Sequence, residues 1–117
     1  MRARESTEAA RLDRMFFALA DAQRRGLLDR LSRGPASVSE LAEPLGLALP
    51  SALKHLAVLE RGGFVVSQKP GRVRTYTARP AALEAMEAWV ARRKAQLDAQ
   101  FDRLETYLAG QPPRGPR

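Results

Sequence analysis

Cysteine is absent from this chain of 117 residues, and His55 is its only histidine. Without thiols, the chain has no disulfide framework and no thiolate metal site. No apolar run approaches the roughly 20 residues that cross a bilayer, and the first residues lack an apolar signal segment. We therefore expect a cytoplasmic protein. The sequence also contains no catalytic triad pattern and no glycine-rich phosphate loop, so we expect neither an enzyme nor a bound cofactor.

Positive charge is in excess, with 20 Lys and Arg against 13 Asp and Glu and a net charge of +7. Such an excess favours a polyanionic partner, although an arginine-rich composition also accompanies a GC-rich genome. The length predicts one domain with a modest core. We expect this domain over residues 8–110, between a flexible N-terminus at 1–7 and a disordered basic tail at 111–117.

The stretch over residues 37–64 predicts two short helices joined by a tight turn. Ser37 and Glu40 form an S-x-x-E capping box at the start of the first helix. Gly46 suits the left-handed end of that helix, and Pro50 fits the start of the next. The second helix has a buried stripe and a glycine stop: Ala52, Leu56, Leu59, Gly62, Gly63. This pattern is typical of a helix-turn-helix, whose second helix enters the DNA major groove.

Two helices are predicted before this motif. The first, over 9–20, has an apolar stripe at helical spacing, with Phe17 beside the stripe; the stripe is Leu12, Met15, Phe16 and Leu19. Phe17 suits either the core or a second subunit. Asp21 is the expected cap of the second helix, which we predict to reach residue 33. In that helix we expect leucines to face inward and arginines outward, respectively Leu27, Leu28, Leu31 and Arg24, Arg25, Arg30.

A β-hairpin is predicted after the motif, from β-prone residues at 64–67 and 73–77 around a Pro-Gly turn. Lys69, Arg72 and Arg74 lie at or beside its tip. A cationic hairpin after a helix-turn-helix is typical of a wing that contacts the DNA backbone or minor groove. The alternative is a solvated hairpin whose charges discourage edge pairing.

The last predicted helix, over 80–108, is far longer than the average of about 11–12 residues. Apolar residues recur every seventh position along it, as in the seam of paired helices: Leu83, Val90, Leu97, Leu104. We expect its first half to pack within the chain and its second half to pair with another subunit. The fold class is thus mainly α with a small β-hairpin, a winged helix-turn-helix of five helices and a two-stranded wing.

In this order of elements, the sequence resembles the ArsR/SmtB family of bacterial winged-helix repressors. The matching segments are residues 18–31, 37–65 and 71–78, and the family pattern S-x-x-x-H-L-x-x-L-x-x-x-G is met by Ser51, His55, Leu56, Leu59 and Gly63. The resemblance implies a homodimer that binds an inverted repeat in double-stranded DNA and represses its own or a neighbouring operon.

Metal sensors of that family carry a Cys-x-Cys-type pair where this chain has Glu40-Leu41-Ala42-Glu43, and the last helix here has no histidine. The resemblance therefore implies the subgroup without metal sites, and the effector stays unknown. Asp98, Asp102 and Glu105 share a helical face, which we interpret as a solvated, salt-bridging face. Ala48 stands at the expected cap of the second motif helix and offers no side-chain acceptor.

We expect DNA contacts from the second motif helix and the hairpin, at Ser51, Leu53, Lys54, His55, Lys69, Arg72 and Arg74. Leu53 suits a thymine methyl or, equally, packing beside Leu49 and Leu56. By resemblance, His55 contacts a phosphate or a base. We expect dimerisation through both terminal helices, at Leu12, Phe16, Phe17, Val90, Leu97, Phe101, Leu104 and Leu108. The alternative function is a winged-helix module for protein–protein contact.

Overall fold

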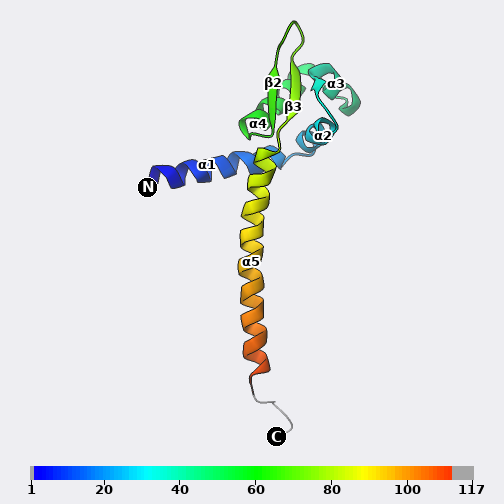
Figure 1. The fold of residues 1–117 in the computed structure, drawn as a ribbon. Coiled ribbons are helices and arrows are strands. Elements are labelled where there is room, and N and C mark those ends of the chain that lie inside the picture. Colours follow the sequence, from blue (N-terminus) through cyan, green and yellow to red (C-terminus); the bar gives the residue numbers. More distant parts are fainter. Residues whose placement is uncertain (1, 112–117) are drawn as a thin grey trace. The chain divides into compact units, whose positions relative to one another are not determined.

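The computed structural model describes residues 2–111, and it describes side chains from residue 7. Within that range it contains five α-helices and a small antiparallel sheet (Figure 1), which confirms the predicted winged helix-turn-helix class. The chain divides into two compact units, Met1–Met86 and Glu87–Arg117. Of the predicted tail, residues 112–117 lie outside the described residues.

The first two helices differ from the prediction mainly in their ends. Helix α1 (Arg2–Leu19) begins before the expected residue 9, so residues 2–7 form its first turns. Helix α2 (Ala22–Leu31) follows the predicted cap, because Asp21 Oδ1 accepts from the backbone N–H groups of Gln23 at 2.9 Å and Arg24 at 3.1 Å. Helix α2 ends at Leu31 rather than at residue 33.

The predicted helix pair is present, with the predicted caps. Helix α3 (Val38–Ala42) starts at a complete capping box, in which Ser37 N donates to Glu40 Oε1 at 2.8 Å and Glu40 N donates to Ser37 Oγ at 3.2 Å. A short 3₁₀ turn, η1 (Glu43–Leu45), contains Pro44 and ends at Gly46, whose φ of 64° is left-handed. Helix α4 (Leu49–Arg61) follows, and Gly63, at φ 83°, turns the chain away after it.

The sheet has three strands rather than the two predicted. Strands β2 (Val65–Gln68) and β3 (Thr75–Ala78) form the hairpin, with Val66 opposite Thr77. Strand β1 (Ala36–Ser37) pairs with β3, where Ala36 lies opposite Tyr76, and the strand order is β1-β3-β2. A two-residue strand carries no readable alternation, so only its distant partner reveals it. Tyr76 is buried, and this burial raises the pKa of its hydroxyl.

The core of the first unit joins side chains from each helix to the sheet. Its largest fully buried members are Phe64, Met15, Leu27, Leu41, Leu56 and Leu59. Helices α1 and α4 approach closely at Gly62. A Cβ there would lie 3.1 Å from Ala18 Cβ and 3.2 Å from the carbonyl oxygen of Arg14, so no side chain fits without movement. The backbone spacing therefore fixes how near α1 lies to α4.

Helix α5 (Ala81–Ala109) contains 29 residues, close to the predicted range of 80–108. Its first residues belong to the first unit, where Ala82 is buried and Met86 packs against the core. From residue 87 onward it makes up the described part of the second unit. No helix within residues 2–111 is long and apolar enough to span a membrane.

Candidate DNA-binding and dimerisation surfaces

Helix α4 separates its buried and exposed residues cleanly near its N-terminus. Ala52, Leu56 and Leu59 are fully buried, at helical spacing. Ser51, Leu53 and Lys54, on either side of Ala52, are exposed. Leu53 keeps 44% of its surface in solvent, which resolves the two readings of this residue in favour of exposure. The arrangement presents a hydroxyl, a methyl-bearing side chain and an ammonium group, which suit phosphate and base-edge contacts.

The N-terminus of α4 lacks a side-chain cap, as predicted. Ala48 is the N-cap residue, with φ −67° and ψ 148°, and no side chain accepts a hydrogen bond from the first turn. Pro50 lies within that turn, where its missing N–H leaves one fewer donor unsatisfied. Backbone N–H groups at an uncapped helix N-terminus favour an anion such as a DNA phosphate.

His55 lies half-buried on α4, in contact with the start of α2. Its Nε2 lies 3.1 Å from Gln23 Oε1, and its Nδ1 lies 3.4 Å from Arg24 Nη1. Both ring nitrogens therefore meet partners within the chain. This placement differs from that of Ser51 and Lys54, whose side chains face solvent.

Arg24 is buried, and the prediction that it faces outward is wrong. Only 8% of its surface is exposed. Its Nε donates to the carbonyl oxygen of Ala18 at 2.7 Å and its Nη2 donates to that of Phe17 at 2.8 Å. The partner carbonyls lie in another helix, which is why the local pattern did not reveal them. The sequence nevertheless contained a signal. Arg24 is spaced from Leu27, Leu28 and Leu31 as i from i+3, i+4 and i+7, which places it on the same buried face of the helix.

The other two arginines of that set differ from Arg24. Arg25 is exposed, and its Nη1 donates to the carbonyl oxygen of Leu19 at 2.7 Å. Arg30 is half-buried and donates to the carbonyl oxygen of Gly34 at 3.1 Å.

The backbone N–H of Arg24 also donates to the Asp21 carboxylate, which lowers the pKa of Asp21.

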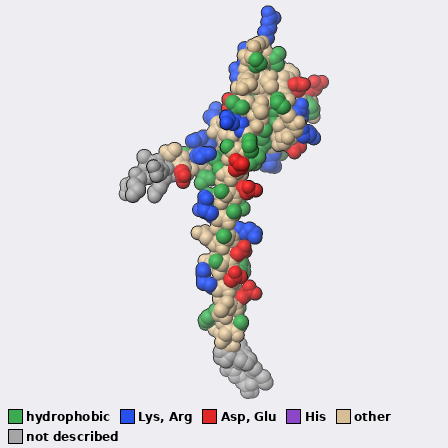
Figure 2. Space-filling model, viewed as in Figure 1, with side chains coloured by type: hydrophobic (Ala, Val, Ile, Leu, Met, Phe, Trp, Pro, Cys, Tyr) green, Lys and Arg blue, Asp and Glu red, His purple; other side chains and the backbone are tan. Residues whose placement is uncertain are grey.

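The hairpin carries its cations at and beside the connecting loop. Lys69, Arg72 and Arg74 are all exposed, and Figure 2 shows basic side chains at the end of the β2–β3 hairpin. Arg74 Nη1 donates to Ser67 Oγ at 3.0 Å, and Ser67 Oγ donates to Glu60 Oε2 of α4 at 3.2 Å. This short chain of hydrogen bonds ties the base of the hairpin to α4, while the loop side chains face solvent.

The apolar residues predicted for dimerisation are largely exposed in the single chain. In α1, Leu12 packs against the core, whereas Phe16 and Phe17 are exposed. The ring of Phe17 lies under the Arg24 guanidinium, 4.9 Å from its carbon to the ring centroid. In α5, half or more of each large side chain of the predicted seam is in solvent: Val90, Leu97, Phe101, Leu104, Leu108. An apolar stripe of this extent is typical of an interaction surface.

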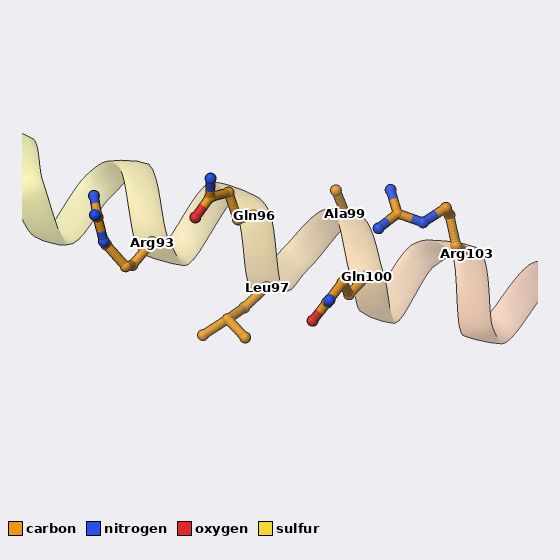
Figure 3. A pocket seen from close by; sticks show the side chains of 6 residues that line it. All are labelled: Arg93, Gln96, Leu97, Ala99, Gln100 and Arg103. Atoms are coloured by element: carbon orange, nitrogen blue, oxygen red, sulfur yellow. The ribbon is translucent and has the colours of Figure 1, made fainter.

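The hollow around Arg93 to Arg103 is a furrow on one helix. Figure 3 shows that its residues all come from α5, and that Leu97 and Ala99 point to opposite sides of the helix. On α5, Lys94 Nζ lies 3.4 Å from Asp98 Oδ2, an exposed ion pair of the predicted kind. Among the residues whose side chains are described, no group of three or more His, Cys, Asp or Glu side chains is placed to hold a metal ion.

Known proteins match this chain in sequence and in structure. A helix-turn-helix domain family matches residues 19–68. The HTH-type transcriptional regulator Rv2034 of Mycobacterium tuberculosis is 39% identical over 74 residues, which cover 63% of this chain and 69% of that protein. The crystal structure of an ArsR family transcriptional regulator, RHA00566, is 48% identical with a TM-score of 0.72, covering 75% of this chain and 97% of that one. The chain belongs to the ArsR family of transcriptional regulators.

Two further matches agree with this assignment. The transcriptional repressor SdpR of Bacillus subtilis is 25% identical over 79 residues, covering 68% of this chain and 88% of that protein. A homodimeric winged helix-turn-helix DNA-binding domain from Mycobacterium bovis is 26% identical with a TM-score of 0.62, covering 86% of this chain and 90% of that one. The ArsR resemblance seen in the sequence is confirmed, and this ArsR-family chain is a DNA-binding transcriptional regulator.

Proposed function

We propose that this ArsR-family regulator acts in the cytoplasm as a homodimer that binds an inverted-repeat operator and represses its own or a neighbouring operon. The single observation that carries the proposal is the apolar stripe of α5, whose large side chains each leave half or more of their surface in solvent in the single chain. The homodimeric relative from Mycobacterium bovis and the repressor SdpR support the assembly and the direction of regulation.

The proposal assigns DNA contact to Ser51, Leu53 and Lys54 on α4 and to the cations of the hairpin, Lys69, Arg72 and Arg74. The exposed cations supply sequence-independent attraction to phosphates, and the α4 side chains face base edges in the major groove. Two copies of α4 must lie about 34 Å apart to enter successive major grooves on one face of the duplex. The dimer interface therefore sets the spacing of the two half-sites.

His55 receives a different role in this proposal. Since its ring nitrogens already meet Gln23 and Arg24, we assign it to the support of α4 and leave direct DNA contact to its exposed neighbours. The apolar surfaces of α1 and α5 are assigned to the second subunit, at Phe16, Phe17, Val90, Leu97, Phe101, Leu104 and Leu108. Leu12, which packs against the core, supports this surface from within.

A gel-shift series tests the proposal with the DNA fragment directly upstream of the chain's own gene. Binding should weaken steeply as salt rises, because phosphate contacts release counterions. Lys54→Ala should weaken binding by about tenfold and reduce the salt slope by about one. Lys94→Ala is the matched control, since it removes an identical charge from the exposed ion pair on α5. Equal effects of the two substitutions, or no shift by the wild-type protein, would contradict the proposal.

A further inference from the structure

The guanidinium of Arg24 is the only buried charged side chain among those described. Its Nε and Nη2 donate to the carbonyl oxygens of Ala18 and Phe17, and its central carbon lies over the Phe17 ring, 4.9 Å from the centroid. Both carbonyls belong to the last turn of α1, where the helix dipole is negative. A cation is therefore stabilised there without a carboxylate partner within salt-bridge distance among the described side chains.

The same guanidinium also reaches α4. Its Nη1 lies 3.4 Å from His55 Nδ1, and the neighbouring Gln23 Oε1 lies 3.1 Å from His55 Nε2. The Asp21 carboxylate holds the turn that carries both partners, because it accepts from the backbone N–H groups of Gln23 and Arg24. Both ring nitrogens of His55 therefore contact residues of the same turn, at the start of α2.

His55 follows Ser51 by one helical turn and is adjacent to Lys54, so the contacts of its ring hold α4 close to these two exposed residues. We propose that Arg24 is a positioning residue for DNA binding, which joins the end of α1 to α4 and sets the orientation of that face. This inference rests on the proposed function. It assigns a role to a side chain that itself never touches DNA.

The chemistry requires arginine rather than any cation. Arginine offers several N–H donors in a rigid planar fork that also stacks on an aromatic ring. Lysine presents one point charge on a flexible stem, so it cannot hold two carbonyls, cover Phe17 and reach His55 together. If Arg24 acted only through its charge, lysine would replace it without loss.

The test uses the full-length chain and a duplex selected by the wild-type protein from a random-sequence pool. Arg24→Lys and Arg24→Met are compared with Arg25→Met. This last variant is a matched control, because Arg25 also donates to an α1 carbonyl but is exposed. We expect each Arg24 variant to bind the selected duplex at least about tenfold more weakly than the wild type, and Arg25→Met to stay within about twofold. Affinities are measured well below the unfolding temperature and are corrected for the folded dimer.

A second readout separates orientation from charge and from stability. Binding to an unselected duplex at low salt depends on the attraction between cations and phosphates. Arg24→Met and Arg25→Met should therefore reduce the affinity for this duplex by the same factor. A double-mutant cycle between Arg24→Met and His55→Ala should be non-additive for the selected duplex, because both substitutions break one contact. Additive losses would overturn the link between the two residues.

The outcomes distinguish this inference from the proposed function. Arg24→Lys retains the charge and most of the volume, so it keeps the test decisive even if Arg24→Met does not fold. A wild-type protein that binds its selected duplex, with Arg24→Lys binding equally well, would overturn the inference alone. A wild-type protein that enriches no sequence would overturn the proposed function, and the inference with it.

Discussion

The two units of the chain differ in how much of their large apolar side chains is exposed to solvent. In the first unit, Leu27 of α2, Leu56 of α4 and Phe64 before the sheet are fully buried in one core. In the described part of the second, residues 87–111, Val90, Leu97, Phe101, Leu104 and Leu108 each leave half or more of their surface in solvent. Burial of such surface stabilises a protein by about 25 cal/mol per Å². The comparison teaches that the first unit buries its apolar residues within the chain, whereas under the proposed function the second unit is expected to bury its stripe against a partner.

The largest expected effect is on assembly. Leu104→Glu puts a charge into the exposed stripe of α5 and should convert the dimer into a monomer, because an unpaired charge is costly to bury. Ala99→Glu adds the same charge away from the stripe, since Ala99 points to the side opposite Leu97 (Figure 3). Light scattering after size-exclusion chromatography measures both masses. A Leu104→Glu protein that remains dimeric would contradict the assignment of the α5 stripe to the dimer interface.

Shortening a buried side chain of the core should lower the stability of the first unit without affecting the dimer. Leu56 is fully buried, so Leu56→Ala should reduce the free energy of unfolding by about 2–5 kcal/mol. Leu104→Ala removes the same atoms from an exposed position, so its effect should come through the dimer and depend on protein concentration. Urea unfolding at two concentrations separates them. The opposite pattern of concentration dependence would mean that the buried and exposed stripes have been assigned the wrong roles.

A smaller gain is expected at the start of α4. Ala48→Ser supplies the missing side-chain acceptor and should raise the free energy of unfolding by about 1 kcal/mol. Ala99→Ser is the control, because serine within a helix should lower stability slightly. Thermal unfolding measures both variants. An unchanged or lower midpoint for Ala48→Ser would show that the first turn of α4 gains nothing from a cap.

The smallest expected effect is a dependence on acid in the first unit. The backbone N–H of Arg24 lowers the pKa of Asp21 below its ordinary 3.8, and the backbone N–H of Ser37 lowers the pKa of Glu40 below its ordinary 4.5. A depressed folded pKa gives stability that is present above the unfolded pKa and lost as pH falls through the folded pKa. The loss should therefore begin near pH 4.5 and continue below 3.8.

The double variant Asp21→Asn, Glu40→Gln keeps both caps but removes both titrating groups. Its thermal midpoint should fall less steeply than that of the wild type between about pH 5 and about pH 3. Parallel curves for the two proteins would show that other carboxylates govern the acid response.

The features that the sequence predicted correctly are those with local causes. The capping box at Ser37 and Glu40, the cap at Asp21 and the left-handed Gly46 each depend on residues within one turn. Strand β1 depends on a partner far along the chain, Tyr76. The burial of Arg24 depends on carbonyls of the preceding helix, which the apolar pattern of α2 alone does not show. The period of the apolar residues identified the stripe of α5, but it left open whether Leu53 was buried or exposed.

The division of α4 into separate buried and exposed positions has an evolutionary consequence. Ala52, Leu56 and Leu59 hold the helix in the core, while Ser51, Leu53 and Lys54 contribute little to that packing. Exposed positions away from caps and networks usually change stability by less than about 0.5 kcal/mol when substituted. Under the proposed function, we therefore expect a few mutations at these positions to change the operator preference while the fold stays intact.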